Sequence, residues 1–221
     1  MPIRTNKTDS FLFSRALLST AYLPPVEFFA VLANSEEVLL ERYETFQKQS
    51  YRTRCHIYGA NGLLALTLPV KRDSTHRLPI TEIQIDYSSR WLLQHKRALE
   101  AAYMTTPFFE YYKDDLYAVM ESGEESLFTF NCNIIKLFCE LAGIHTKISF
   151  TSDYTPAGAS TIPDFRESIH PKYKGENVLS LYGIEKPYYQ VFSRKQGFIS
   201  NLSMIDLLSH EGPNSISFLR I

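Results

Sequence analysis

A short basic segment near residue 50 carries the side chains best suited to chemistry. It contains Lys48, Arg52, Arg54 and His56. If residues 51–58 form a strand, the two arginines and the histidine share one face, because side chains alternate along a strand. A guanidinium offers a planar fork that fits phosphate or carboxylate, and a lysine adds a point charge. The segment therefore predicts a site for an anionic small molecule, with Lys48 also a candidate catalytic group.

The same charges fit a second interpretation. Basic side chains on an exposed strand face are common, and nearby carboxylates can pair with them. The carboxylates available for such pairing are Glu41, Glu44 and Glu82. From the sequence, the anion site and the paired surface are both open.

His95 is the candidate for proton transfer. It lies in an apolar stripe at helical spacing, between Trp91 and Ala98, which places it inward or at the rim of a pocket. An imidazole there can act as a general base or acid near neutral pH. The alternative is a core histidine that is hydrogen-bonded to a backbone carbonyl.

Four further residues are candidates for substrate binding. Tyr22 ends an expected strand, where ligands bind in open α/β sheets, although a core aromatic fits equally well. Gln190 places a polar amide among the aromatic residues of another expected strand. Asn201 and Ser203 precede the last expected helix, whose first N–H groups favour an anion. Ser203 is better explained as the cap of that helix, with Asp206 as its capping-box partner.

Common catalytic and metal-binding motifs are absent from the chain. It contains no GxGxxG, GxxxxGK[ST], GxSxG or HExxH. Cys55, Cys132 and Cys139 form no CxxC pair, so we expect neither a disulfide framework nor a metal site, and a reducing compartment fits best. The sequence identifies no cofactor.

The composition is that of a globular cytoplasmic protein. Of the 221 residues, 44% are hydrophobic, which suffices for a core. The net charge of −1 argues against a nucleic-acid partner and means that any anion site is local. No apolar run reaches the roughly 20 residues that cross a bilayer, and the polar start lacks the apolar region of a signal peptide. The oligomeric state is not indicated.

The first part of the chain predicts a βαβ unit followed by a hairpin. The elements expected before residue 90 are strands at 17–22, 38–43, 51–58, 63–70 and 80–86, and a helix from Pro25 to residue 34. A strand, a helix and a second strand in close succession favour a parallel pair. The Asn61-Gly62 dipeptide between two apolar runs is a hairpin signal.

Helices dominate the middle of the chain. The elements expected after residue 90 are helices at 91–103, 107–120 and 127–142, strands at 147–150, 178–182 and 188–192, and a helix from Ser203 to Gly212. Residues 151–175 are rich in Thr, Pro, Ser and Gly and predict a long loop. The charged run within it, from Asp164 to Lys172, is either a lid or a solvated loop.

These elements predict an α/β fold with a mixed sheet and an N-terminal βαβ unit that is Rossmann-like in its order. An antiparallel α+β fold is the rival, because of the hairpin. We expect one domain over residues 16–221, preceded by a frayed N-terminus over residues 1–15.

Several motifs in this order resemble the WbqC-like protein family. They are Tyr22-Leu23-Pro24, Gln47-Lys48, Arg52-Thr53-Arg54-Cys55-His56, Leu66-Thr67-Leu68-Pro69-Val70, Trp91 with His95, Tyr188-Tyr189-Gln190-Val191-Phe192 and Asn201-Leu202-Ser203-Met204-Ile205-Asp206. The resemblance implies a transferase of acyl or aminoacyl groups, with a nucleotide-using reaction as one form, in the synthesis of surface polysaccharide such as O-antigen. A non-catalytic binding or scaffold protein of that pathway is the alternative. Over residues 162–172 the chain departs from the family pattern.

Overall fold

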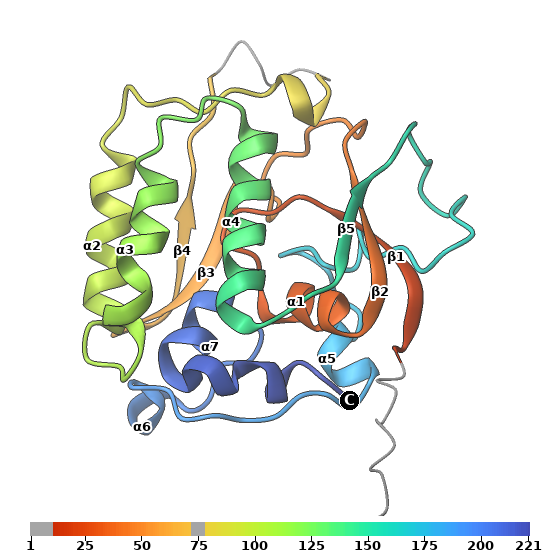
Figure 1. The fold of residues 1–221 in the computed structure, drawn as a ribbon. Coiled ribbons are helices and arrows are strands. Elements are labelled where there is room, and N and C mark those ends of the chain that lie inside the picture. Colours follow the sequence, from red (N-terminus) through yellow and green to blue (C-terminus); the bar gives the residue numbers. More distant parts are fainter. Residues whose placement is uncertain (1–10, 72–77) are drawn as a thin grey trace, which may run out of the picture.

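One of the two sheets of the fold is parallel and lies at the right of Figure 1. The structure, a computed structural model, describes residues 11–71 and 78–221. Strand β1 (Phe13–Ser19) pairs in parallel with β2 (Ser35–Glu41), and β2 pairs in parallel with β5 (Lys147–Phe150). The predicted βαβ unit is therefore confirmed.

The hairpin forms a second, separate sheet. Strand β3 (Arg54–Gly59) pairs antiparallel with β4 (Gly62–Thr67), and Gly59 lies opposite Gly62 across a turn at Ala60 and Asn61. The α/β fold class is confirmed, but the parallel and antiparallel pairs lie in different sheets instead of one mixed sheet.

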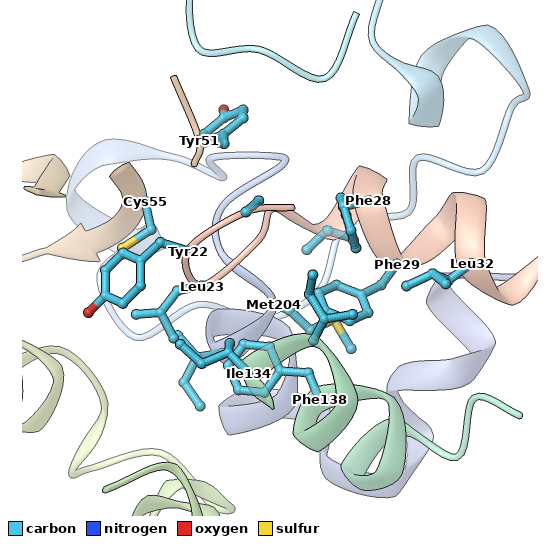
Figure 2. Close-up of a cluster of buried hydrophobic side chains, with 14 of the residues drawn as sticks. Tyr22, Leu23, Phe28, Phe29, Leu32, Tyr51, Cys55, Ile134, Phe138 and Met204 are labelled. Atoms are coloured by element: carbon cyan, nitrogen blue, oxygen red, sulfur yellow. The ribbon is translucent and has the colours of Figure 1, made fainter. Parts of the chain in front are cut away.

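Helix α1 (Val26–Ala33) joins β1 to β2 and is buried on every side. All of its residues except Glu27 are apolar, and a helix that is apolar all round belongs in a core. Figure 2 shows Phe28 and Phe29 of α1 packed in one cluster with Phe138 and Met204, which come from two later helices. The core is thus built around α1.

Three long helices cover one side of the sheets (Figure 1). They are α2 (Trp91–Tyr103), α3 (Phe109–Met120) and α4 (Leu127–Ala142). The predicted ends of α4 are confirmed. The Ser126 side chain accepts a hydrogen bond from the Thr129 N–H, and Gly143 closes the helix in the left-handed conformation, with φ of 67°. Helix α3 begins two residues later than expected, at Phe109.

The C-terminal third consists of short elements. These are α5 (Val178–Leu181), α6 (Ser193–Gln196), α7 (Met204–Glu211) and the 3-10 helix η3 (Gly212–Phe218). Of these, α5 and α7 lie against α1. The N–H of Val26 donates to the carbonyl of Leu202 (2.9 Å), and the N–H of Met204 donates to the carbonyl of Pro24 (2.8 Å). These bonds tie the start of α7 to the start of α1.

Three predicted strands are wrong. The isoleucines at 80, 83 and 85 are buried, but Ile80 lies in the 3-10 helix η2 (Ile80–Glu82), Ile83 is the C-cap of η2, and Ile85 forms an isolated bridge with Val70. Residues 178–182 form α5, because Asn177 caps it by accepting a hydrogen bond from the Ser180 N–H. Residues 188–192 have no strand partner and are irregular. A short apolar run does not by itself distinguish a strand from a helical turn or an irregular segment.

Residues 151–177 contain neither a helix nor a ladder strand, as expected for a long loop. The frayed N-terminus was expected to reach residue 15, but β1 already begins at Phe13. Residues 1–10 of that segment lie outside the described residues. No helix in the described parts of the chain has the length and apolar character needed to cross a membrane.

Gly143 provides a test of this architecture. Its φ of 67° disfavours any residue with a Cβ atom, while no atom lies within 4 Å of the place where a Cβ would stand. We expect Gly143→Ala to lower the free energy of unfolding by about 1 kcal/mol, through backbone strain alone. Urea denaturation measures the loss. Lys136→Ala, an exposed change within α4, is the control, and an equal loss in both variants would contradict the assignment.

Candidate functional site

The carboxyl ends of β1 and β2 meet a later segment of the chain. The N–H of Leu17 donates to the carbonyl of Pro163 (2.9 Å), and the N–H of Phe165 donates to the carbonyl of Leu17 (3.0 Å). Residues 163–165 thus extend the sheet beyond β1, whereas β2 and β5 extend it on the opposite side. In open α/β sheets, ligands bind outside the carboxyl ends of strands where the connections diverge in this way.

Arg52 and Glu44 form a buried ion pair at this edge. The Arg52 Nε donates to Glu44 Oε1 (2.8 Å), and its Nη2 contacts Glu44 Oε2 and donates to the Ser19 hydroxyl (2.7 Å). Only 3% of Arg52 and 5% of Glu44 is exposed. Ser19 ends β1, so the pair is fixed to the strand end.

Arg166 forms a second set of ion pairs beside the first. Its Nε and Nη2 donate to the two Asp164 oxygens (2.9 and 2.6 Å), and its Nη1 donates to Glu41 Oε2 (3.1 Å). Glu41 ends β2 and is fully buried. The hydrogen bonds that Arg166 donates to Asp164 raise the pKa of the guanidinium. The charged run that was expected to be a lid or a solvated loop therefore places Asp164 and Arg166 in a buried network.

We call these five residues, Glu41, Glu44, Arg52, Asp164 and Arg166, the strand-end cluster. It holds three carboxylates and two guanidiniums, so its formal charge is −1. Ions are costly to bury unless they are paired, and a buried network of this kind adds little net stability. It lies at the carboxyl ends of two parallel strands, the edge of the sheet at which ligands bind in open α/β folds.

Two hollows lie against the strand-end cluster. The larger has a volume of about 110 Å³ and is lined by Glu44, Gln47, Tyr154 and Arg166 among others. The Tyr154 ring lies 5.9 Å from the Arg166 Cζ. The smaller, of about 10 Å³, has room for one water-sized group. It is bordered by Thr20, whose buried hydroxyl has no hydrogen-bond partner among the described residues.

The remaining basic residues of the first segment lie apart from these pairs. Strand β3 begins at Arg54, so Arg52 precedes the strand and does not share a strand face with Arg54 and His56 as expected. Arg54 is half-buried on β3, where burial and this arginine lower the pKa of His56. Lys48 is exposed, forms no ion pair within the described parts of the chain, and directly follows Gln47 of the larger hollow.

Tyr22 and His95 form a buried pair. The Tyr22 hydroxyl lies 2.8 Å from His95 Nδ1, and a backbone hydrogen bond with Thr67 engages the imidazole as well. Since a carbonyl accepts only from an N–H, Nδ1 is the acceptor for the tyrosine hydroxyl. Burial lowers the pKa of His95 to about 4, so the ring is neutral at pH 7. Its packing against Trp91, with ring centroids 5.3 Å apart, holds it inward as expected.

Asn201 binds α1 in this structure. Its amide Nδ2 donates to Glu27 Oε1 (2.7 Å), and its Oδ1 accepts from the Glu27 N–H (3.0 Å). The N–H of Val178 donates to the other Glu27 oxygen (3.2 Å). Burial raises the pKa of Glu27. Asn201 thus satisfies a buried carboxylate at the start of α1, and a role in substrate binding stays a prediction.

The predicted capping box at Ser203 is wrong in its side chains. Ser203 occupies the N-cap position of α7, but its hydroxyl makes no capping bond. Asp206 instead binds residues that precede α7: the Tyr188 hydroxyl (2.5 Å) and Gln190 Nε2 (2.9 Å) donate to its Oδ2. Gln190 also holds both the N–H and the carbonyl of Ile199. Because both polar atoms of its amide are hydrogen-bonded within the protein, Gln190 is an internal bridge, one of the two roles expected for it.

Sequence reasoning identified Arg52 as a site residue and missed the other four residues of the strand-end cluster. Glu41 and Glu44 were considered only as partners of surface charges, and Asp164 and Arg166 only as parts of a loop. The available signal was a pair of opposite charges, two residues apart, in an otherwise pattern-poor segment. No group of three His, Cys, Asp or Glu side chains suited to a metal occurs in the described residues.

The buried pair of Arg52 and Glu44 predicts a large effect of single mutations. Arg52→Ala leaves the Glu44 carboxylate buried and unpaired, so we expect a loss of about 3–5 kcal/mol in the free energy of unfolding. The double variant Arg52→Met with Glu44→Gln should lose clearly less. Arg15→Ala, which removes an exposed partner of Glu37, is the control with a loss below about 1 kcal/mol. Equal losses in all three variants, measured by urea denaturation, would contradict the burial of this pair.

His95 predicts a dependence of stability on pH. Its folded pKa of about 4 lies below the ordinary histidine pKa of 6.5, so the unfolded chain binds the proton more tightly. Stability from this group is complete above pH 6.5 and is lost as the pH falls toward 4, by up to about 3 kcal/mol. His95→Gln should flatten this part of the profile in urea titrations. The exposed His145→Gln is the control, and a wild-type slope in His95→Gln would refute the prediction.

Comparisons with known proteins agree with the resemblance found in the sequence. The model of the WbqC-like protein family matches residues 20–183, a range that includes the whole strand-end cluster. An uncharacterised protein of Mycobacterium tuberculosis, Rv1507c, is 24% identical over 224 residues, which cover 93% of this chain and 96% of the relative. No solved structure matches the chain. Since the family model covers most of its length, the chain belongs to the WbqC-like protein family.

Proposed function

We propose that this protein is a transferase that moves an acyl or aminoacyl group to an acceptor bound at the strand-end cluster. The observation that carries the proposal is the buried network at the carboxyl ends of β1 and β2, next to a hollow of about 110 Å³. Paired ions at that edge add little to stability, so a role in ligand binding is the better reason for their presence.

The acceptor in this proposal carries an amino or hydroxyl group. The formal charge of −1 on the strand-end cluster favours an amine over a free anion. The acceptor nitrogen or oxygen bonds to the carbonyl carbon of the donor, and the bond from that carbon to the leaving group breaks. Glu44, which lines the larger hollow, takes the acceptor proton and passes it to the leaving group.

The guanidiniums supply the positive charge that acyl transfer needs. Negative charge develops on the carbonyl oxygen of the donor, and a fixed donor of hydrogen bonds stabilises it. Arg166 borders both hollows, Arg52 borders the smaller one, and both guanidiniums are held rigidly by their carboxylates. Lys48 adds charge next to the larger hollow. Proton transfer by His95 stays a prediction, and the contacts of its ring fit a residue that positions Tyr22.

The pathway and the location of the protein are also part of the proposal. The family resemblance favours a role in the synthesis of surface polysaccharide, where amino sugars offer acceptor amines. The three cysteines are unpaired thiols, as is usual in a reducing cytoplasm.

A second candidate is a binding or scaffold protein without catalytic activity. It is favoured because the candidate catalytic side chains already have hydrogen-bond partners. Arg52 and Arg166 bind carboxylates, and the His95 ring is hydrogen-bonded to Tyr22 and to the backbone of Thr67. Such a protein binds its ligand but forms no product. Repeated turnover therefore separates the two functions.

The proposal is tested with acyl-CoA, aminoacyl-adenylate analogues, nucleotides and nucleotide sugars as ligands, and with amino sugars as acceptors. A donor at a hundredfold excess over its Kd should raise the Tm by about 5–10 °C. Mass spectrometry of the acceptor then detects transfer. We expect Glu44→Gln to lower kcat/KM by about 10²–10⁴-fold, and Arg166→Lys, which keeps the charge but loses the fork, by at least about tenfold.

Arg97→Ala, an exposed change on α2, is the matched control and should transfer at the wild-type rate. Circular dichroism confirms that each variant is folded. Binding of a donor without transfer to any acceptor would favour the scaffold function. Transfer that survives both Glu44→Gln and Arg166→Lys would refute the strand-end cluster as the catalytic site.

A further inference from the structure

A groove on the other side of the β2 end is larger than either hollow of the strand-end cluster. Its volume is about 460 Å³, against about 110 and 10 Å³. That size lies within the range of pockets that bind small molecules. The groove lies between the end of β5, the start of α4 and the residue after β2.

The charge of the groove is opposite to that of the strand-end cluster. Among the described residues that line it, Arg42 is the charged one, since burial raises the pKa of the Cys132 thiol to about 12. Arg42 is exposed, lies with its Cζ 5.4 Å from the Tyr43 ring centroid, and pairs with no carboxylate of the described residues. Its guanidinium fork is therefore available to a phosphate or carboxylate.

The groove also offers an aromatic surface. Phe150 is 47% exposed at the end of β5, and its ring lies 5.5 Å from that of the buried Phe128. Phe128 fixes the position of Phe150, whose outer surface is open to stack on a planar ring. Thr129 and Asn133 add polar groups along the same wall.

One hydrogen-bonded chain connects the groove to the strand-end cluster. The backbone N–H of Arg42 donates to the Thr151 hydroxyl (3.2 Å), and that hydroxyl lies 2.8 Å from Glu41 Oε1. Thr151 directly follows Phe150, and Glu41 directly precedes Arg42. The two sites therefore share a wall made by the ends of β2 and β5.

We propose that this groove binds a nucleotide, with its phosphate on Arg42 and its base stacked on Phe150. If the protein is a transferase as proposed above, the nucleotide is part of the donor, and the donor and acceptor lie on either side of Glu41. The nucleotide site itself follows from the charge, the aromatic surface and the volume of the groove.

Calorimetric titration with ADP, adenosine and inorganic phosphate tests the site. We expect ADP to bind most tightly, because it alone engages both Arg42 and Phe150. Arg42→Ala should weaken ADP at least about tenfold and leave adenosine unchanged. Phe150→Leu, which keeps the apolar contact with Phe128, should weaken ADP and adenosine by similar factors of about tenfold. Arg97→Ala is the control and should bind as the wild type.

Further outcomes separate this inference from the proposed transferase. Arg166→Lys should leave ADP affinity unchanged while it lowers transfer. ADP affinity that depends on Arg42 in a protein without transfer supports the groove and refutes the transferase. If ADP does not bind, or if Arg166→Lys weakens it while Arg42→Ala and Phe150→Leu do not, the groove is not the nucleotide site.

Discussion

The complete burial of α1 is the constraint on which the rest of the structure depends. A helix of eight residues without an exposed side must be covered from every direction, and the parallel sheet covers only one of them. The remaining cover comes from α4, α5 and α7, which lie more than a hundred residues later in the chain. The Glu27 carboxylate, the polar exception in α1, needs its own partners and finds them in Asn201 and Val178. The C-terminal third is thus required by the sequence of a short N-terminal helix.

The same constraint places the candidate site. Because α1 fixes β1 and β2 in parallel, their carboxyl ends lie at one edge, and the long loop after β5 brings Asp164 and Arg166 to that edge. The ionic groups are then divided in space. The strand-end cluster carries an excess of negative charge, while the groove beyond Glu41 has the unpaired Arg42. If two ligands of opposite charge bind, this separation of charge would attract the cationic one to the strand-end cluster and the anionic one to the groove.

Local signals in the sequence predict those elements whose partners are close along the chain. The βαβ unit, the Asn61-Gly62 hairpin, the cap at Ser126 and the end of α4 at Gly143 are examples. The apolar runs at 80–86, 178–182 and 188–192 were wrongly predicted as strands, because an apolar run forms a strand only where a partner strand lies beside it. For the same reason, the sequence predicted only part of the candidate site. Arg52 was found by its type and spacing, whereas its neighbour Arg166 depends on a crossover that no local pattern records.

The parallel pairing of β2 with β5 has a consequence for how the chain folds during synthesis. Val38 lies beside Ile148, and α1 meets α7 beyond residue 203, so the native core around the N-terminal apolar residues cannot close until residues beyond 203 have left the ribosome. Contacts between such distant segments carry a high entropic cost and slow the folding reaction. Phe28, Phe29 and Leu32, which lie in the buried cluster of Figure 2, therefore stay exposed in the nascent chain until those later segments follow, and such exposed apolar residues favour aggregation.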